Sequence, residues 1–450
     1  MAKRRSILGS AALVLLSISA GVGAAAILYR LLVGLTTTNI TGTISWGLWV
    51  VFYIYFIGLS AGSFLLSTLV FVFGIERFEP VGRLAIFSAL MALAAGLLFI
   101  FLDLGHYERF ITVYTHRNWN SVLTWEIHFY AAYIFILLGE LYLLLRRDLV
   151  ILARNSKGLM WVFYRAVSLY SDRTDEAANR RDHSLIRILG FVGLPIAIGV
   201  HGGTGALFAV LKARPYWFGG LFPVVFVISA IASGGALLAG TQAYFGRKDE
   251  NHAGLTNSLA SLAAGVLAFD LLMLLSETFI GIYSDIPEHN VVFEAIMQGP
   301  FSWVFWGVQL LIGAVIPVAM ILSGRWKDRP KILGLACFSM VFGILGVRAN
   351  IVVPSQTVEA IHGLFGAYVD ARSSHFYFPS WPEYLSSMGV IACVLLASVI
   401  GYRLLPITWE PTEHAKNPHD RAVVSAEKPG GALETAEKPG GAEHPSHVLG

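Results

Sequence analysis

The chain has 450 residues, of which 56% are hydrophobic and only 14% are charged. In soluble domains about a quarter of the residues are charged, so this composition excludes a soluble globular protein and indicates a polytopic membrane protein. The net charge of +3 is small, and we expect no nucleic acid among the partners. The two cysteines form no CxxC or CxxCH motif, so the chain is expected to hold no metal, no iron–sulfur cluster and no c-type haem.

Ten apolar segments are predicted to cross the bilayer, whose hydrocarbon core is ~30 Å thick. In chain order they cover 9–29, 46–73, 84–102, 122–145, 186–211, 220–245, 257–283, 302–323, 332–347 and 385–404. The predicted fold is therefore an all-α integral membrane protein with about ten transmembrane helices that form bundles. The first segment has a basic start and small residues, which also describe a secretory signal. We expect it to be retained as a helix, but its removal stays open.

The basic residues lie mainly in alternate connections between these segments. If both termini are cytoplasmic, 25 of the 32 Lys and Arg residues lie on the inner side, as the positive-inside rule requires. Residues 1–404 then form the transmembrane domain, with a cytoplasmic loop at 146–185 and an outer-face loop at 348–384. Residues 405–450 are polar and rich in Pro and Gly, and they repeat AEKPGGA. We predict a disordered cytoplasmic tail there.

The fourth predicted span carries polar residues along one stripe. Glu126, Tyr130, Tyr133 and Glu140 follow the spacing i, i+4, i+7 and i+14, which places them on one helix face. The predicted orientation puts Glu126 at the outer end and Glu140 at the inner end. Either glutamate can also lie simply at the membrane interface, and this alternative stays open.

Three further polar residues interrupt the apolar segments. His201 lies in the outer half of the fifth span, where neighbouring glycines let another helix or a flat ligand approach. Asp270 and Glu277 lie two turns apart on one face of the seventh span. A charged residue costs about 2.5–3.5 kcal/mol at the centre of a membrane helix, so such residues usually face a bundle interior and mark a site. Structural pairing of Asp270 and a packing role for His201 are the alternatives.

Taken together, these polar residues are stronger evidence for a functional site than any one of them alone. With His106 and His128 at comparable depth, carboxylates on two helices are typical of a proton relay, a quinol site or a coupled transporter. Haem b is a weaker prediction, because bis-histidine ligation needs opposing histidines inside spans and only His201 lies well inside one.

Six segments, in order along 45–404, carry a family resemblance. They read WGLWVVFYIYFIGLSAGSFLLSTL, DLGHYERF, ARPYWFGGLFPVVFVISAIASG, SETFIGIYSD, GVRANIVVPSQ and FYFPSWPEYLSSMGV. Their order and spacing resemble the NrfD-like (polysulfide reductase type) integral membrane subunits of respiratory complexes, in the ten-helix branch. The sequence departs from that pattern at His106, where an arginine is more usual.

The resemblance implies a multi-pass subunit of a respiratory oxidoreductase in the cytoplasmic membrane of a prokaryote. Such a subunit binds quinone or quinol near the outer face, with menaquinone or ubiquinone as substrate, and holds no haem or iron–sulfur cluster itself. It exchanges electrons with a ferredoxin-like iron–sulfur subunit at the outer face. Further redox subunits are expected, namely a cytochrome, a molybdenum enzyme, a hydrogenase or a sulfur-metabolism enzyme. Proton conduction and the direction of electron flow stay open.

Site residues follow from position and from the family pattern, and none is expected to be catalytic or metal-binding. We expect quinone binding at His201, Glu126, Asp103, His106 and Tyr130. For a proton pathway we expect Asp270, Glu277, Glu140 and Tyr133. The family pattern also carries onto Arg109, Arg348, Asn350 and Gln356, although Arg348 can equally be an interfacial anchor.

Two other functions compete with this prediction. A secondary transporter fits buried carboxylates and many spans, but the sequence shows no convincing repeat between its halves and no paired broken helices. A structural membrane anchor without quinone chemistry fits the apolar spans alone.

Overall fold

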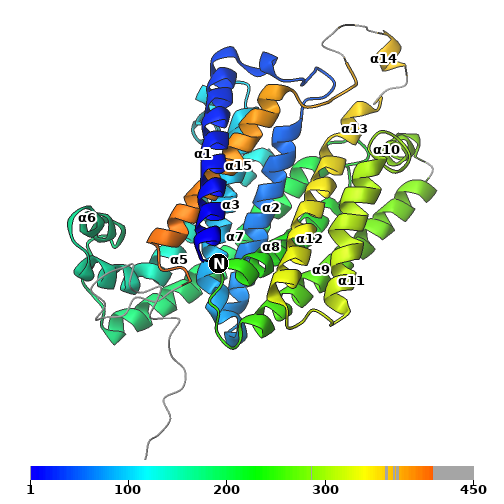
Figure 1. The fold of residues 1–450 in the computed structure, drawn as a ribbon. Helices are drawn as coiled ribbons and strands as arrows, with labels where there is room; N and C mark the ends of the chain where they lie inside the picture. The colour runs from blue at the N-terminus through cyan, green and yellow to red at the C-terminus, as the bar shows by residue number, and fades with distance from the viewer. Residues whose placement is uncertain (1, 285, 360–362, 368–369, 371–373, 409–450) are drawn as a thin grey trace, which may run out of the picture.

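The computed structural model describes residues 2–284, 286–359, 363–367, 370 and 374–408 (Figure 1). Within these ranges the regular elements are all helices, and ten helices are long and apolar enough to cross a membrane. The prediction of an all-α membrane protein with ten spans is therefore confirmed. The spans are α1 (Ala2–Val33), α2 (Leu48–Phe71), α3 (Gly82–Asp103), α5 (Val122–Asn155), α7 (Glu176–Ala209), α8 (Phe222–Phe245), α9 (His252–Tyr283), the π-helix η4 (Trp303–Val315) continued by α11 (Ile316–Leu322), α12 (Pro330–Val352) and α15 (Trp381–Leu404).

Short helices connect the spans. They are η1 (Leu35–Thr37), η2 (Glu76–Val81), η3 (Tyr107–Arg109), α4 (Thr112–Thr115), α6 (Gly158–Val167), α10 (Pro287–Met297), α13 (Pro354–Thr357) and α14 (Leu364–Ala367). We call the end of the bundle where α5 ends and α7 begins the basic end, and the end where α2, α5 and α8 begin the opposite end. The prediction that the basic end and both termini face the cytoplasm stays a prediction.

Three spans differ clearly from their predicted boundaries. α5 continues to Asn155 and α7 begins at Glu176, so much of the predicted 146–185 loop is helical. Arg146 on α5 explains part of this, because it donates to Asp182 on α7 over 2.6 Å and joins the two extensions. α12 continues to Val352, so the start of the predicted 348–384 loop lies inside a helix. The tail is predicted at 405–450, and only 405–408 of it belong to the described residues.

Local sequence signals set several helix starts. α8, α12 and α15 each have a proline in the first turn, where its missing N–H costs nothing. α15 also begins with a capping box, in which the Ser380 side chain accepts from the Glu383 N–H and the Glu383 side chain accepts from the Ser380 N–H. The carboxylate of Glu383 is fully buried there, and a helix N-terminus favours its negative charge.

Helix α2 lies in the middle of the bundle and packs against α3, α7 and α8 (Figure 1). α8 in turn packs against α9 and α12, while α1 packs mainly against α15. The contact of α1 with α15 passes through two glycines, since a Cβ added at Gly23 would lie 2.0 Å from the Cα of Gly389. Small residues let helix backbones meet in this way inside a membrane.

A second glycine contact sets the position of η4. A Cβ added at Gly343 on α12 would lie 2.1 Å from the Cα of Gly313 on η4. We expect Gly343→Ala to destabilise the protein by about 1–3 kcal/mol, because an overpacked contact forces a backbone shift. The thermal unfolding midpoint in detergent measures this. Gly265→Ala on α9 is the matched control, since nothing lies within 4 Å of a Cβ added there. Equal midpoints for the two variants would contradict the prediction.

Candidate functional site

Glu126 is the centre of a buried polar cluster between α2, α5 and α7. Its side chain is 1% exposed, and its Oε1 accepts hydrogen bonds from Tyr53 (2.8 Å), Tyr130 (3.1 Å) and Thr204 (2.6 Å). The second oxygen, Oε2, is buried and has no hydrogen-bond partner among the described residues. A buried polar atom without a hydrogen-bond partner costs folding free energy. A ligand that donates a hydrogen bond to Oε2 would remove this cost.

The remaining residues of the α5 stripe lie nearer the basic end. Tyr133 is fully buried and donates to the Ser60 carbonyl over 3.2 Å. Glu140 is 1% exposed, and its Oε1 has no hydrogen-bond partner among the described residues. All four members of the stripe therefore face the protein interior, as their spacing predicts.

A second polar group lies one turn earlier on α7 than Thr204. His201 is 1% exposed, and its Nε2 lies 3.3 Å from Nη2 of Arg348 on α12. The same Nη2 donates to Ser229 on α8 over 2.9 Å, and the guanidinium stacks 4.7 Å from the Phe226 ring centre. Arginine only donates, so Nε2 of His201 is the acceptor and its other nitrogen, Nδ1, carries the proton. Nδ1 is buried and has no hydrogen-bond partner among the described residues.

Asp270 and Glu277 line a cavity of about 60 Å³ between α8, α9, η4 and α12. Asn350 and Gln309 line it as well, and the Asn350 amide donates to Gln309 over 2.9 Å. One oxygen of Asp270 and the amide oxygen of Asn350 are buried without a hydrogen-bond partner among the described residues. A water needs about 10–15 Å³ and polar neighbours, so this cavity has room and partners for several waters.

The cavity is connected to the other two groups by charge. The guanidinium of Arg348 interacts electrostatically with Asp270, and Arg348 also contacts His201. His201 in turn lies three residues before Thr204 on α7, so the two share a helix face. Polar side chains are therefore distributed from Glu126 to the cavity across α5, α7, α12 and α9, and the contact of His201 with Arg348 joins two of these helices.

Tyr216 extends the cavity toward the opposite end. It lines the 60 Å³ cavity and also a smaller one of about 10 Å³, together with Arg214 and Glu288. Apolar surroundings, and then the Glu277 carboxyl, raise the pKa of Tyr216, so this phenol keeps its proton at neutral pH. It is a neutral polar group between the two cavities.

Asp103 and His106 do not join Glu126, which corrects the predicted grouping. Asp103 ends α3 beside Arg30 of α1, whose guanidinium donates to the carbonyls of Leu102 (2.7 Å) and Leu104. His106 lies in the surface turn after α3, where 67% of its side chain is exposed and it contacts Glu108 over 2.9 Å. The turn after α3 directs His106 to the surface, and the number of residues between His106 and the span could not predict that direction.

The residues carried over from the family pattern divide into two kinds. Arg348 and Asn350 lie in the buried site, so the interfacial-anchor alternative does not hold for Arg348, which is 0% exposed. Gln356 has a structural position, since its Oε1 accepts from the N–H groups of Ser45 (2.9 Å) and Trp46 (3.1 Å) just before α2. The Arg109 side chain is 69% exposed.

Sequence reasoning missed several residues of the site. Gln309 interrupts the apolar stretch WVFWGVQLLIGAV, and the argument applied to Asp270 would have found it. Tyr53, Thr204 and Ser229 carry no such signal, because hydroxyl side chains are common in membrane helices and often bond their own backbone.

Ten apolar helices that enclose carboxylates, a histidine and an arginine define a multi-pass integral membrane protein with a polar interior. A family model described as Polysulphide reductase, NrfD, matches residues 36–360, and the chain belongs to this family. The resemblance inferred from the six segments is thereby confirmed. Members are membrane subunits of multi-subunit reductase complexes.

Relatives of different names cover most of the chain. It is 40% identical over 397 residues to a subunit of the selenate reductase of Mesobacillus selenatarsenatis, and the match covers 87% of this chain and 93% of that protein. It is 27% identical to the Hdr-like menaquinol oxidoreductase integral membrane subunit of Archaeoglobus fulgidus (83% and 87% covered). It is 23% identical to the menaquinone reductase integral membrane subunit of Nitratidesulfovibrio vulgaris (86% and 88% covered).

Proposed function

We propose that this chain reacts with quinone or quinol inside the membrane and exchanges the electrons with a partner iron–sulfur protein. Two of the relatives carry menaquinol or menaquinone in their names, which supports a quinone as substrate. Family membership favours a redox subunit over a secondary transporter. The partner docks at the opposite end of the bundle, which faces outward from the cytoplasmic membrane if the basic end is inside.

The observation that carries the proposal is the pair of unpartnered polar atoms on α5 and α7. A quinol hydroxyl needs an acceptor, and Oε2 of Glu126 is one. A quinone carbonyl needs a donor, and the Nδ1–H of His201 is one. A Cβ added at Gly203 would reach ordinary van der Waals contact with Cβ and Cγ of Glu126 at 3.8 Å, so α7 packs closely against the stem of that side chain.

Oxidation of a quinol releases two electrons and two protons as its two O–H bonds break. Three hydroxyl donors stabilise the charge of Glu126 before the transfer, and Glu126 then accepts one proton through Oε2. The second proton passes toward the cavity lined by Asp270 and Glu277. Arg348 acts as a positioning residue, because its contact with Nε2 keeps His201 in the tautomer that presents a donor. The electrons leave to the partner protein.

The cavity at Asp270 is proposed to take part in proton movement. Carboxylates beside water-sized space can pass protons by way of ordered waters. Asp270 and Glu277 line this space, and Tyr216 continues it toward the opposite end. Glu140 and Tyr133 are proposed to take part in proton transfer nearer the basic end.

His201→Phe tests the quinone site. The variant keeps a planar ring but removes both nitrogens, so we expect quinol turnover of the purified complex to fall by about 100-fold, within the range of a lost acid–base or hydrogen-bonding group. His201→Gln should recover part of the rate, since an amide accepts from Arg348 and still offers a donor. His183→Phe, at an exposed position of the same helix near the basic end, is the matched control and should be unchanged. Equal turnover for His201→Phe and the control would reject the site.

A further inference from the structure

Helix α6 lies outside the ten spans, and apolar side chains cover both of its faces. One face packs on the protein through Tyr164, which is 2% exposed. The other face is uncovered, with exposures of 83% for Leu159, 47% for Trp161 and 50% for Val162. Leu169 (68%) and Tyr170 (67%) extend this uncovered surface past the end of the helix. A cluster of large apolar side chains on a fixed element indicates a surface that is covered in the functional protein.

The depth of α6 along the bundle follows from two hydrogen bonds. Tyr142 on α5 donates to the Ser168 carbonyl over 3.2 Å, and Tyr164 donates to the Leu404 carbonyl at the end of α15 over 3.0 Å. Tyr142 lies near Leu145, where the apolar sequence of α5 gives way to Arg146, and Leu404 is the last residue of α15. In Figure 1 α6 is seen end-on beside the bundle, so its axis runs across the spans rather than along them. α6 thus lies at the level of the membrane boundary.

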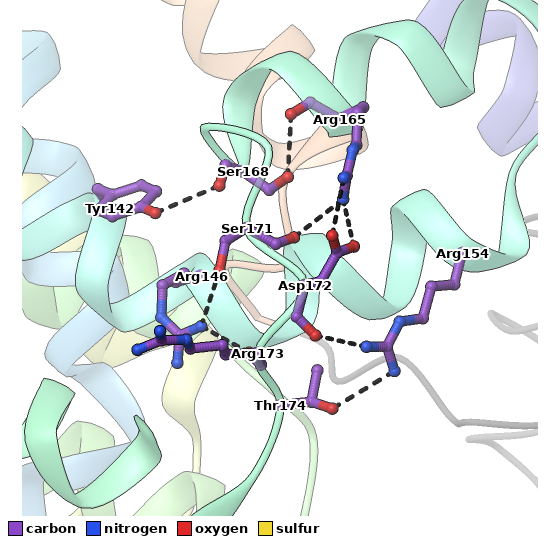
Figure 2. Close-up of polar contacts among 9 residues, drawn as sticks. All are labelled: Tyr142, Arg146, Arg154, Arg165, Ser168, Ser171, Asp172, Arg173 and Thr174. Atoms are coloured by element: carbon purple, nitrogen blue, oxygen red, sulfur yellow. Dashed lines mark hydrogen bonds and ion pairs between the residues drawn. The ribbon is translucent and has the colours of Figure 1, made fainter. Parts of the chain in front are cut away.

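A polar network holds the segment after α6 in one conformation (Figure 2). Arg165 forms a two-pronged ion pair with Asp172 at 2.5 and 2.9 Å, and Arg154 donates to the Asp172 carbonyl over 2.5 Å. The hydrogen bond from Arg165 lowers the pKa of Asp172 below its usual 3.8, so the pair stays charged at neutral pH. Leu169 and Tyr170 adopt φ angles of 51° and 56°, which non-glycine residues rarely do. The ion pair and these backbone conformations therefore fix the positions of the exposed Leu169 and Tyr170 side chains.

The charge around this surface is positive. Residues 146–185 contain eight Lys or Arg and five Asp or Glu, a net charge of +3. Lys157 directly precedes α6 and is exposed, as is Arg147 on α5. Exposed cations beside an apolar face at a membrane boundary match the chemistry of an anionic phospholipid, with acyl chains on one side and phosphate on the other.

We propose that α6, with Leu169 and Tyr170, is an interfacial element that inserts its uncovered face into the bilayer at the basic end and binds anionic phospholipid through Lys157. This inference does not rest on the quinone function. It assigns a lipid-binding role to the connection between α5 and α7. Arg146 and Arg154 join this connection to the extended ends of the two helices, so lipid binding also anchors those ends.

Site-directed spin labelling of the full-length chain in lipid nanodiscs tests the inference. In a Cys393→Ser background, labels are placed at Leu159→Cys and Val162→Cys, with Ala177→Cys on the exposed first turn of α7 as the matched control. Cys337 is buried and stays unlabelled under native conditions. Collisions with oxygen report exposure to acyl chains, and collisions with a water-soluble nickel chelate report exposure to water. We expect oxygen to dominate at 159 and 162, and nickel to dominate at 177.

The lipid composition then tests the charge. Adding phosphatidylglycerol to phosphatidylcholine nanodiscs is expected to move the labels at 159 and 162 further from nickel, and Lys157→Glu is expected to abolish that shift. Nickel accessibility at 159 and 162 equal to that at 177 in both lipids would overturn the inference. Protection from both reagents that arises only when the other subunits of the complex are present would overturn it too, because a protein would then cover the face.

Discussion

Glu126→Gln is expected to lower quinol oxidation by the assembled complex by at least about 100-fold, which is the lower end of the contribution of a positioned general base. Glutamine keeps the shape of the side chain and an oxygen for the three hydroxyl donors of Tyr53, Tyr130 and Thr204. It removes the carboxylate that accepts a proton, so the loss is expected in kcat rather than in folding. Steady-state turnover with a short-chain quinol analogue measures it.

Two comparisons separate chemistry from packing at this position. Tyr53→Phe removes one donor and leaves the carboxylate, so its loss of turnover is expected to be much smaller than that of Glu126→Gln. The unfolding midpoint in detergent should stay close to wild type for both variants. Wild-type turnover in Glu126→Gln would show that the carboxylate takes no proton, and the proposed quinone site would fail.

Arg348→Met is expected to destabilise the protein by about 1–3 kcal/mol, because it leaves buried hydrogen-bond acceptors without their donor. Arg348 is 0% exposed, and the variant leaves the buried carboxyl of Asp270 without its cation and His201 without its donor. Thermal unfolding in detergent measures the loss. Quinol turnover should fall as well, because the His201 tautomer is no longer held.

A double-mutant cycle identifies the coupling. Asp270→Asn alone removes a charge from the cavity and is expected to reduce proton release per quinol more than it reduces stability. Arg348→Met with Asp270→Asn should be more stable than Arg348→Met alone, since no uncompensated carboxylate remains in the bundle. Additive losses in stability would contradict the pairing. Unchanged proton release in Asp270→Asn would remove the cavity from the proposed proton pathway.

Apolar length and helical spacing predicted most of the fold. All ten spans were predicted because a membrane helix needs a long apolar segment. The inward-facing polar residues were predicted because helical spacing places them on one face. The helical extensions of α5 and α7 were missed because they lie in polar sequence, where the contact of Arg146 with Asp182 joins them. Such a long-range contact has no local signature.

The candidate site was predictable residue by residue but not as a set. Burial of Glu126, His201 and Asp270 follows from the cost of charge in lipid. Their grouping depends on which helices are neighbours, and His106 was grouped wrongly because a short turn decides its direction. The π-helical winding of η4, which presents Gln309 to the cavity, has no recognisable sequence signal.

The pairing of α1 with α15 has a consequence for how the protein is made. Helix α1 finds its main packing partner only when α15, about 350 residues later in the chain, has been inserted. Until then the glycine seam at Gly23 is open to lipid, and the N-terminal helix is tethered but not docked. Biogenesis of this protein therefore includes a late docking step that joins α1 to α15.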